Sequence, residues 1–139
     1  MMERGSINIT ENEQHEFTVE VKLIEGTVWL SEWQIASIFN VCSQKIEANI
    51  RSIFKSSLLN EQEVTYKYEL VDCGFKKEQI LYNLEIVVFL SFRIASFEAK
   101  AFRKWFFRGF SEHMKGDKNR VPNMLIVLDG NSNYPITLC

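Results

Sequence analysis

Residues 43–55 carry polar side chains whose types and spacing could contact nucleic acid. At 100° per residue, Ile46, Ile50, Ile53 and Phe54 fall on one side of a helix over this segment. The other side presents Gln44, Lys45, Ala48, Arg51, Ser52 and Lys55, and Ser43 at the helix start is a further candidate DNA contact. A glutamine amide can pair with an adenine edge, a lysine with guanine or phosphate, and cations further along the helix with phosphates. The pattern predicts a DNA-reading helix, and the alternative is a helix whose polar face is only solvated.

The segment before this helix has the spacing of a helix-turn-helix. Ser31 and Gln34 form a capping box that starts a first helix, and Ala36 is small enough to let a second helix approach closely. Asn40 stands at the turn, where a left-handed backbone is needed; asparagine tolerates it at a cost of about 1 kcal/mol relative to glycine. Val41 supplies the apolar residue after the turn. The spacing predicts two helices packed at a steep angle, and a helical hairpin that only builds a core is the alternative.

Residues 64–82 alternate in the way of a β-hairpin that follows the second helix. Its basic residues are Lys67 on the first strand and Lys76 and Lys77 near the turn. Two helices followed by a two-stranded wing are the order of a winged helix, and a wing can contact the DNA backbone. The same hairpin could instead close a sheet with residues 17–30, and the two interpretations are compatible.

A ladder of cations occupies one side of the last predicted helix. Lys100, Lys104 and Arg108 are spaced at i, i+4 and i+8, where like charges repel by a few tenths of a kcal/mol per pair. The ladder favours an anionic partner, phosphate or protein, with a solvated face as the equal alternative. The same helix carries more aromatic residues than one buried face can hold. We therefore expect it to be buried on two sides or to form a dimer interface.

Two arginines have predicted structural partners. Glu47 stands four residues before Arg51, so the two can form an ion pair along the helix. Arg93 lies in an otherwise apolar segment, where an unpaired cation would be costly. We expect it to bond to Glu85 or Glu98, or to main-chain carbonyl groups.

Enzymatic chemistry finds little support in the sequence. His15 and His113 are isolated, and no metal-ligand, nucleophile-elbow or phosphate-loop motif occurs. Cys42, Cys73 and Cys139 form no closely spaced pair, so each is interpreted as a small apolar residue of a reducing compartment. We therefore expect no catalytic site, no metal, no cofactor and no small-molecule substrate.

The composition indicates one globular domain. Among 139 residues, 46% are hydrophobic and only two are proline, which is enough for a core. No apolar run approaches the roughly 20 residues that span a bilayer, and no signal segment opens the chain, so a cytoplasmic protein is expected. Bases are concentrated in the predicted helical parts, with eight against four acids in residues 84–120. The predicted elements are a strand at 17–23, a short strand at 28–30 that returns along it, helices at 31–39 and 43–59, and the hairpin at 64–82. A buried central helix at 84–94, with Asn83 as its N-cap, and a last helix at 96–113 follow.

The chain contains three separated motifs, in this order: "TVWLSEWQIASIF" (27–39), "YNLE" (82–85) and "FRIASFEAKAFRKW" (92–105). Together they resemble the RhuM family of virulence-associated bacterial proteins carried on mobile elements. The resemblance covers about residues 17–110 and implies a DNA-binding protein related to phage and plasmid regulators. Asn40 replaces a turn glycine of the family pattern, Cys42 a helix-capping serine and Ser91 a glycine. The missing serine predicts that the second helix is capped by Ser43 instead.

The sequence therefore predicts an α+β fold: a winged helix-turn-helix with a small antiparallel sheet and two C-terminal helices. Residues 1–16 would be an N-terminal tail, 17–115 the domain and 116–139 a C-terminal tail with a β-hairpin. The predicted function is binding of duplex DNA as a regulator, in a homodimer joined through the last helix or the tail. The alternative is a protein-interaction module that has lost DNA binding.

Overall fold

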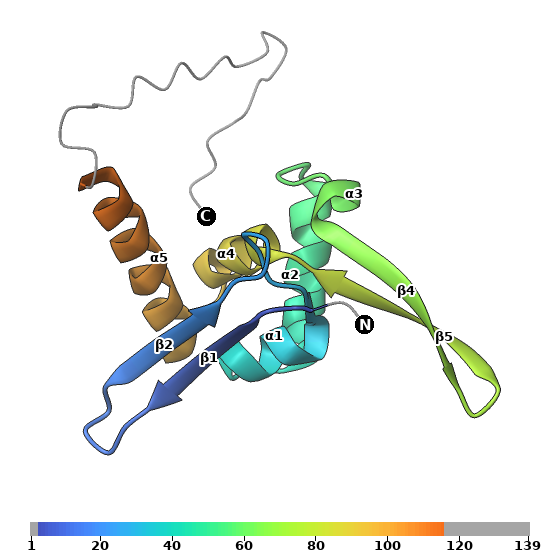
Figure 1. The fold of residues 1–139 in the computed structure, drawn as a ribbon, viewed down its shortest axis with the longest axis horizontal. Coiled ribbons are helices and arrows are strands. Elements are labelled where there is room, and N and C mark those ends of the chain that lie inside the picture. The colour runs from blue at the N-terminus through green and yellow to red at the C-terminus, as the bar shows by residue number, and fades with distance from the viewer. Residues whose placement is uncertain (1–2, 116–139) are drawn as a thin grey trace, which may run out of the picture.

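The computed structural model describes residues 3–115, which form a mixed α+β fold with two small antiparallel sheets and five helices (Figure 1). In chain order the elements are β1 (Ser6–Glu11), β2 (Phe17–Lys22), β3 (Leu30–Ser31), α1 (Glu32–Phe39), α2 (Ser43–Lys55), α3 (Glu61–Val64), β4 (Thr65–Asp72), β5 (Phe75–Tyr82), α4 (Leu84–Arg93) and α5 (Phe97–Lys115). The α+β class and the two C-terminal helices are confirmed within these residues. The predicted hairpin of the 116–139 tail lies outside them.

The first strand is a correction to the sequence prediction. Residues 1–16 are expected to be a tail, yet β1 lies within them and pairs antiparallel with β2, with Ile7 opposite Val21 and Ile9 opposite Val19. The four apolar side chains share one face of the hairpin and pack on the core, where Ile7 is buried. An alternation of only two apolar residues in β1 is too short to predict this pairing.

β3 also pairs differently from expectation. Residues 28–30 are predicted to return along 17–23, but Leu30 pairs with Tyr82 and Ser31 with Leu81, both on β5. The resulting strand order is β3-β5-β4. The hairpin of β4 and β5 thus joins a sheet at its base and projects from the helical centre as an arm (Figure 1). The hairpin does close a sheet with residues 30–31, whereas β2 belongs to the other sheet.

α1 and its turn follow the prediction closely. The backbone N–H of Gln34 donates to Ser31 Oγ at 3.2 Å, and the backbone N–H of Ser31 donates to Gln34 Oε1 at 2.8 Å, which completes the capping box. Asn40 ends the helix in the left-handed conformation, with φ 55° and ψ 49°. The Val41 amide then donates to the Ala36 carbonyl at 3.0 Å. Asparagine therefore serves in place of glycine at this turn.

The start and end of α2 differ from the prediction. Cys42 is the N-cap residue, in an extended conformation with φ −72° and ψ 150°, and its side chain makes no capping hydrogen bond. The cap does not move to Ser43, because the backbone geometry of the turn already places residue 42 at the helix start. The helix ends at Lys55 rather than at residue 59, and the short α3 follows.

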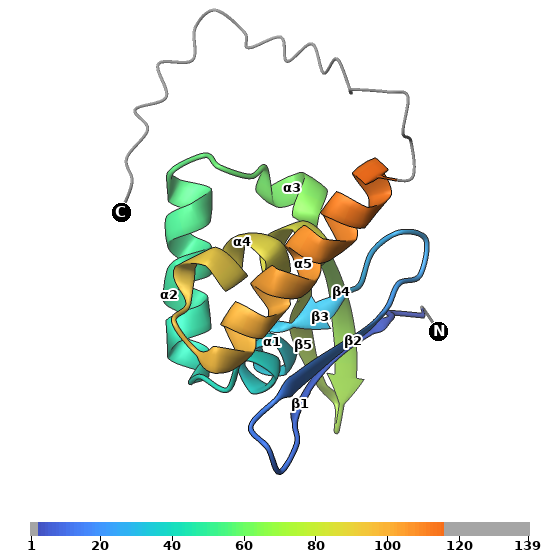
Figure 2. The same cartoon turned by 90° about the vertical axis from the view of Figure 1, so that its left-hand side faces the viewer.

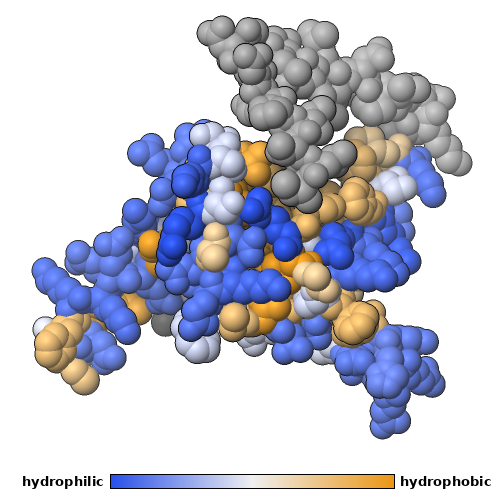
Figure 3. Space-filling view, turned by 180° about the vertical axis from the view of Figure 1, so that it is seen from behind, coloured by the Kyte–Doolittle hydropathy of each residue, from blue (hydrophilic) through white to orange (hydrophobic). Residues whose placement is uncertain are grey.

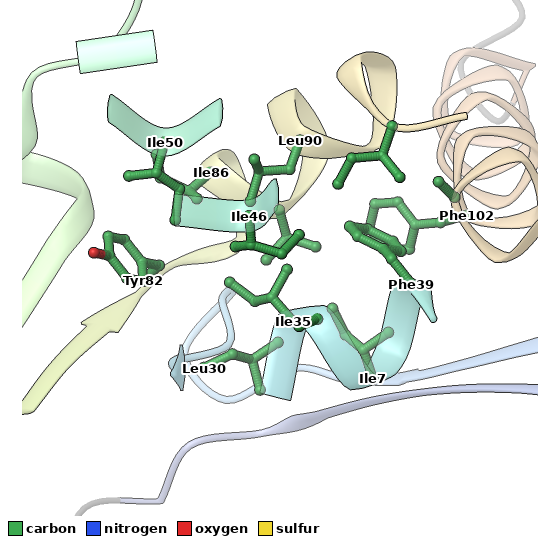
Figure 4. Packing of buried hydrophobic residues seen from close by; sticks show 14 of the residues in the cluster. Ile7, Leu30, Ile35, Phe39, Ile46, Ile50, Tyr82, Ile86, Leu90 and Phe102 are labelled. Carbon is green, nitrogen blue, oxygen red and sulfur yellow. The ribbon is translucent and has the colours of Figure 1, made fainter. Parts of the chain in front are cut away.

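The core forms where α1, α2 and α4 meet. Ile35 and Phe39 of α1 lie against Ile46 and Ile50 of α2 and Leu90 of α4 (Figure 4). From α5, Phe102 packs edge-on against Phe39, with ring centroids 5.7 Å apart. Burying this apolar stripe of α2 directs its polar side outward.

α4 is central, but it is not buried all round, which corrects the sequence prediction. Ile86, Val87, Leu90 and Ser91 are buried, while Phe92 is 51% exposed and packs edge-on against Phe107 of α5. Beyond α4, Arg103 of α5 donates to the carbonyl groups of Ser91 and Ile94. These bonds satisfy acceptors that the end of α4 would otherwise leave unpaired.

We expect Cys42→Ser to stabilise the fold by about 1 kcal/mol, because a serine hydroxyl at this N-cap can accept from a first-turn amide. Chemical denaturation measures the effect. The matched control is Ser31→Ala, which removes the cap of α1 from a similar backbone conformation and should destabilise by a similar amount. Equal stability of Cys42→Ser and the wild type would contradict the capping argument.

Candidate nucleic-acid interface

The outward side of α2 presents the polar side chains that the sequence singled out. Ile46, Ile50 and Ile53 are buried on the inner side. The predicted DNA-contacting residues that are exposed are Gln44, Lys45, Ala48, Arg51 and Lys55, and Ser43 is half-buried. The helix is thus held by its apolar stripe, and the opposite stripe covers no other described element. This is the arrangement that a groove-reading helix requires.

Arg93 adds a cation to this surface that the sequence did not assign to it. Its Nε donates to Asn49 Oδ1 at 3.1 Å and its Nη2 to Ser52 Oγ at 2.7 Å, so α4 holds a guanidinium along one flank of α2. Figure 2 shows the two helices side by side. The predicted partners Glu85, Glu98 and main-chain carbonyls were wrong, because two half-buried polar side chains of α2 lie nearer. Asn49 and Ser52 could have indicated this contact from the sequence, because both border the apolar stripe of α2 on the same side of the helical wheel.

The other flank of α2 is acidic. Arg51 Nη2 lies 2.7 Å from Glu47 Oε1, which confirms the predicted ion pair. Beside it is a hollow of about 530 Å³ lined by Glu32, Glu47, Ile50, Arg51, Phe54, Lys55, Glu61 and Tyr82. Burial raises the pKa of Glu32, Glu47 raises it further, and Arg51 opposes both. Three carboxylates therefore share this flank with Arg51 and Lys55, while Lys45 lies on the outer side of α2 and Arg93 beside α4.

The three arm lysines do not form one cluster. Side chains alternate across the paired strands, and Lys67 lies opposite Ile80 while Lys76 lies opposite Val71. These two lysines share the face of the sheet that bears Tyr82, whereas Lys77 points to the other face. Glu69 and Glu78 pair between them. The three lysines of the arm are therefore separated from one another and do not form a single basic patch.

The cation ladder of α5 borders a groove against β2. Lys100, Lys104 and Arg108 line a hollow of about 630 Å³. Its aromatic lining includes Phe17 and Phe97, whose rings stack with centroids 6.3 Å apart. The other lining residues are His15, Glu16, Thr18, Val19, Ala101 and Trp105. This second surface combines aromatic rings and positive charge but lies on other elements than α2.

The surplus aromatic residues of α5 are partly accounted for by contacts within the fold. Trp105 packs on Phe102, and Phe107 contacts both Phe92 and Phe106. Phe97, by contrast, is 73% exposed at the edge of the groove.

Three further features concern metal binding, the cysteines and membrane insertion. Within residues 3–115, no three His, Cys, Asp or Glu side chains come together in a way that could hold a metal ion. Cys42 and Cys73 are free and exposed. None of the helices in the described part of the chain is long and apolar enough to cross a membrane.

Tyr82, which lines the hollow beside α2, makes the free energy of unfolding depend on pH. Burial, and then the nearby carboxylates Glu32, Glu61 and Glu47, raise its pKa from 10.0 to about 12. Between these values the unfolded chain loses the proton while the folded protein keeps it, so stability falls as the pH rises from about 10 to about 12. We expect Tyr82→Phe to remove this part of the decrease, measured as unfolding free energy against pH. Parallel profiles of the two proteins above about pH 10 would contradict it.

Comparisons with protein-family models, with curated proteins and with solved structures give no match to this chain.

Proposed function

We propose that this protein binds duplex DNA through α2, as a winged helix-turn-helix regulator of the RhuM type. The observation that carries the proposal is the exposed polar side of α2, which holds Gln44, Lys45, Arg51 and Lys55 beside the anchored guanidinium of Arg93. In this role Gln44 and Ala48 meet base edges, and the cations contact phosphates on either side of the groove.

The topology around α2 supports the proposal. A short strand, two helices and a hairpin follow one another as β3, α1, α2 and the β4–β5 arm, and the first strand pairs with the last. This is the order of a winged helix-turn-helix, with the arm as the wing. The short α3 is inserted between α2 and the wing. The motif order shared with the RhuM family supports the same assignment, and both lead to a regulatory role on a mobile element.

The charge distribution indicates how α2 would lie on DNA. Phosphates are attracted to the outer side and to the Arg93 flank and are repelled by Glu32, Glu47 and Glu61 on the arm side. The ion pair of Glu47 also offsets the charge of Arg51. We therefore infer that Lys45 and Arg93 supply the main phosphate contacts near α2, and that affinity depends on a small number of cations.

Fluorescence anisotropy with a labelled mixed-sequence duplex tests the proposal. We expect the double change Lys45→Ala, Arg51→Ala to weaken binding between about 50 and 200 mM salt. The slope of log K against log salt should fall by about 1 for each phosphate that the variant no longer neutralises. Arg93→Ala should act in the same direction. The control Lys22→Ala removes an exposed cation from β2 and should change neither quantity.

A variant that removes a negative charge tests the proposal in the opposite direction. Glu47→Gln removes a negative charge and frees Arg51 from its ion pair, so affinity should rise. If the wild type shows no affinity for duplex DNA at about 50 mM salt, the proposal is wrong.

A second candidate function is binding of an acidic protein segment in the groove between β2 and α5. It is favoured by the exposed ring of Phe97, stacked on Phe17 beside three cations. A partner protein held there should dissociate from the Phe97→Ala variant and stay bound to the variant with the double change in α2. A weaker DNA affinity of the α2 variant, with the partner still bound, would separate the two functions.

A further inference from the structure

The outer edge of the arm has open backbone hydrogen-bonding groups. β4 ends the strand order β3-β5-β4, and its register with β5 runs without a bulge from Thr65 to Asp72. No backbone hydrogen bond joins the outer side of β4 to another described segment. An open edge of this kind can add a further strand, and proteins that avoid this use proline, bulges or charged side chains, above all lysine, along the edge.

Between Tyr66 and Leu70, only one face of β4 carries such charges. Tyr66 and Leu70 are 45% and 44% exposed, and Tyr68 lies between them on the same face. The other face carries one cation and one anion two residues apart, Lys67 and Glu69. Tyr68 is already held in place, because its hydroxyl donates to Gln79 Oε1 at 2.6 Å and the guanidinium of Arg4 lies over its ring.

Geometry limits how β4 can pair with a second copy of itself. In an antiparallel ladder, opposite residues direct their backbone groups either both toward or both away from each other. Because this direction alternates along a strand, a two-fold axis must pass through a residue and not between two residues. An axis at Lys67 sets lysine against lysine, and an axis at Glu69 sets glutamate against glutamate. An axis at Tyr68 sets Lys67 opposite Glu69 twice and Tyr66 opposite Leu70 twice.

We propose that β4 pairs with β4 of a second copy of this chain, antiparallel about a two-fold axis at Tyr68. The partner is identified by this self-complementary register, which joins opposite charges on one face and apolar side chains on the other. The edge lies on the arm that projects from the helical centre (Figure 1), so the pairing uses a different element from α2 and includes Lys67 of the proposed wing. Apolar side chains also gather at the tip of the arm (Figure 3), where Val71 and Phe75 are exposed.

The test is a charge exchange followed by analytical ultracentrifugation of the full chain. The wild type should dimerise below about 100 μM. Lys67→Glu places glutamate against glutamate twice, and Glu69→Lys places lysine against lysine twice, so each should raise the dimer Kd about tenfold or more. The double exchange Lys67→Glu, Glu69→Lys should restore the dimer. An equimolar mixture of the two single variants should form a mixed dimer tighter than either variant alone.

Matched controls keep the outcome interpretable. Lys76→Glu and Glu78→Lys make the same charge changes on β5, away from the edge, and should leave the dimer Kd unchanged. Circular dichroism checks that each variant is folded, and all four positions are exposed. A monomeric wild type would overturn the proposal. So would a dimer that neither single variant weakens, because that dimer would use another surface, such as α5. DNA anisotropy of Glu69→Lys distinguishes this proposal from the proposed function, since a monomer that keeps both Lys67 and α2 intact should still bind duplex DNA.

Discussion

The rest of the structure depends on the burial of one apolar stripe of α2. Ile46, Ile50 and Ile53 are enclosed by α1 and α4, and this burial sets the rotation of the helix about its axis. Every polar residue of α2 then has a determined place: outward, beside α4 or toward the arm. A helix rotated by one residue would bury a polar side chain without a partner, at a cost larger than most single stabilising contacts. The candidate interface is therefore a consequence of how the core is packed.

The two flanks of the candidate interface carry different charges. The outer side and the α4 flank carry cations, while the arm side carries three carboxylates around Arg51. The chain as a whole is slightly acidic, with a net charge of −2, so any attraction for an anionic partner must be local. Two local surfaces meet this condition, the α2 face and the ladder of α5 above its aromatic groove. They lie on different elements, so two partners could be bound independently.

Local patterns were sufficient for much of the fold. The capping box at Ser31, the turn at Asn40 and the cap at Asn83 form as predicted, because each depends on residues within a few positions of one another. β1, the N-cap at Cys42 and the separation of β2 from the sheet of β3, β5 and β4 could not be predicted in the same way. Each depends on a partner distant in the chain or on the geometry of a turn, and short apolar alternation does not name its partner strand.

The sequence by itself determined which residues could form the interface, because the 3.6-residue period of a helix separates the apolar side of α2 from its polar side. It also determined the Glu47–Arg51 pair, which a spacing of four residues on one helix brings together. Only the tertiary structure decided that Arg93 joins this surface, that Lys67 shares a face of the arm with Lys76 and that the cations of α5 border a groove with Phe17. These arrangements arise where elements distant in sequence pack together, and periodicity within one element carries no information about the side chains of another.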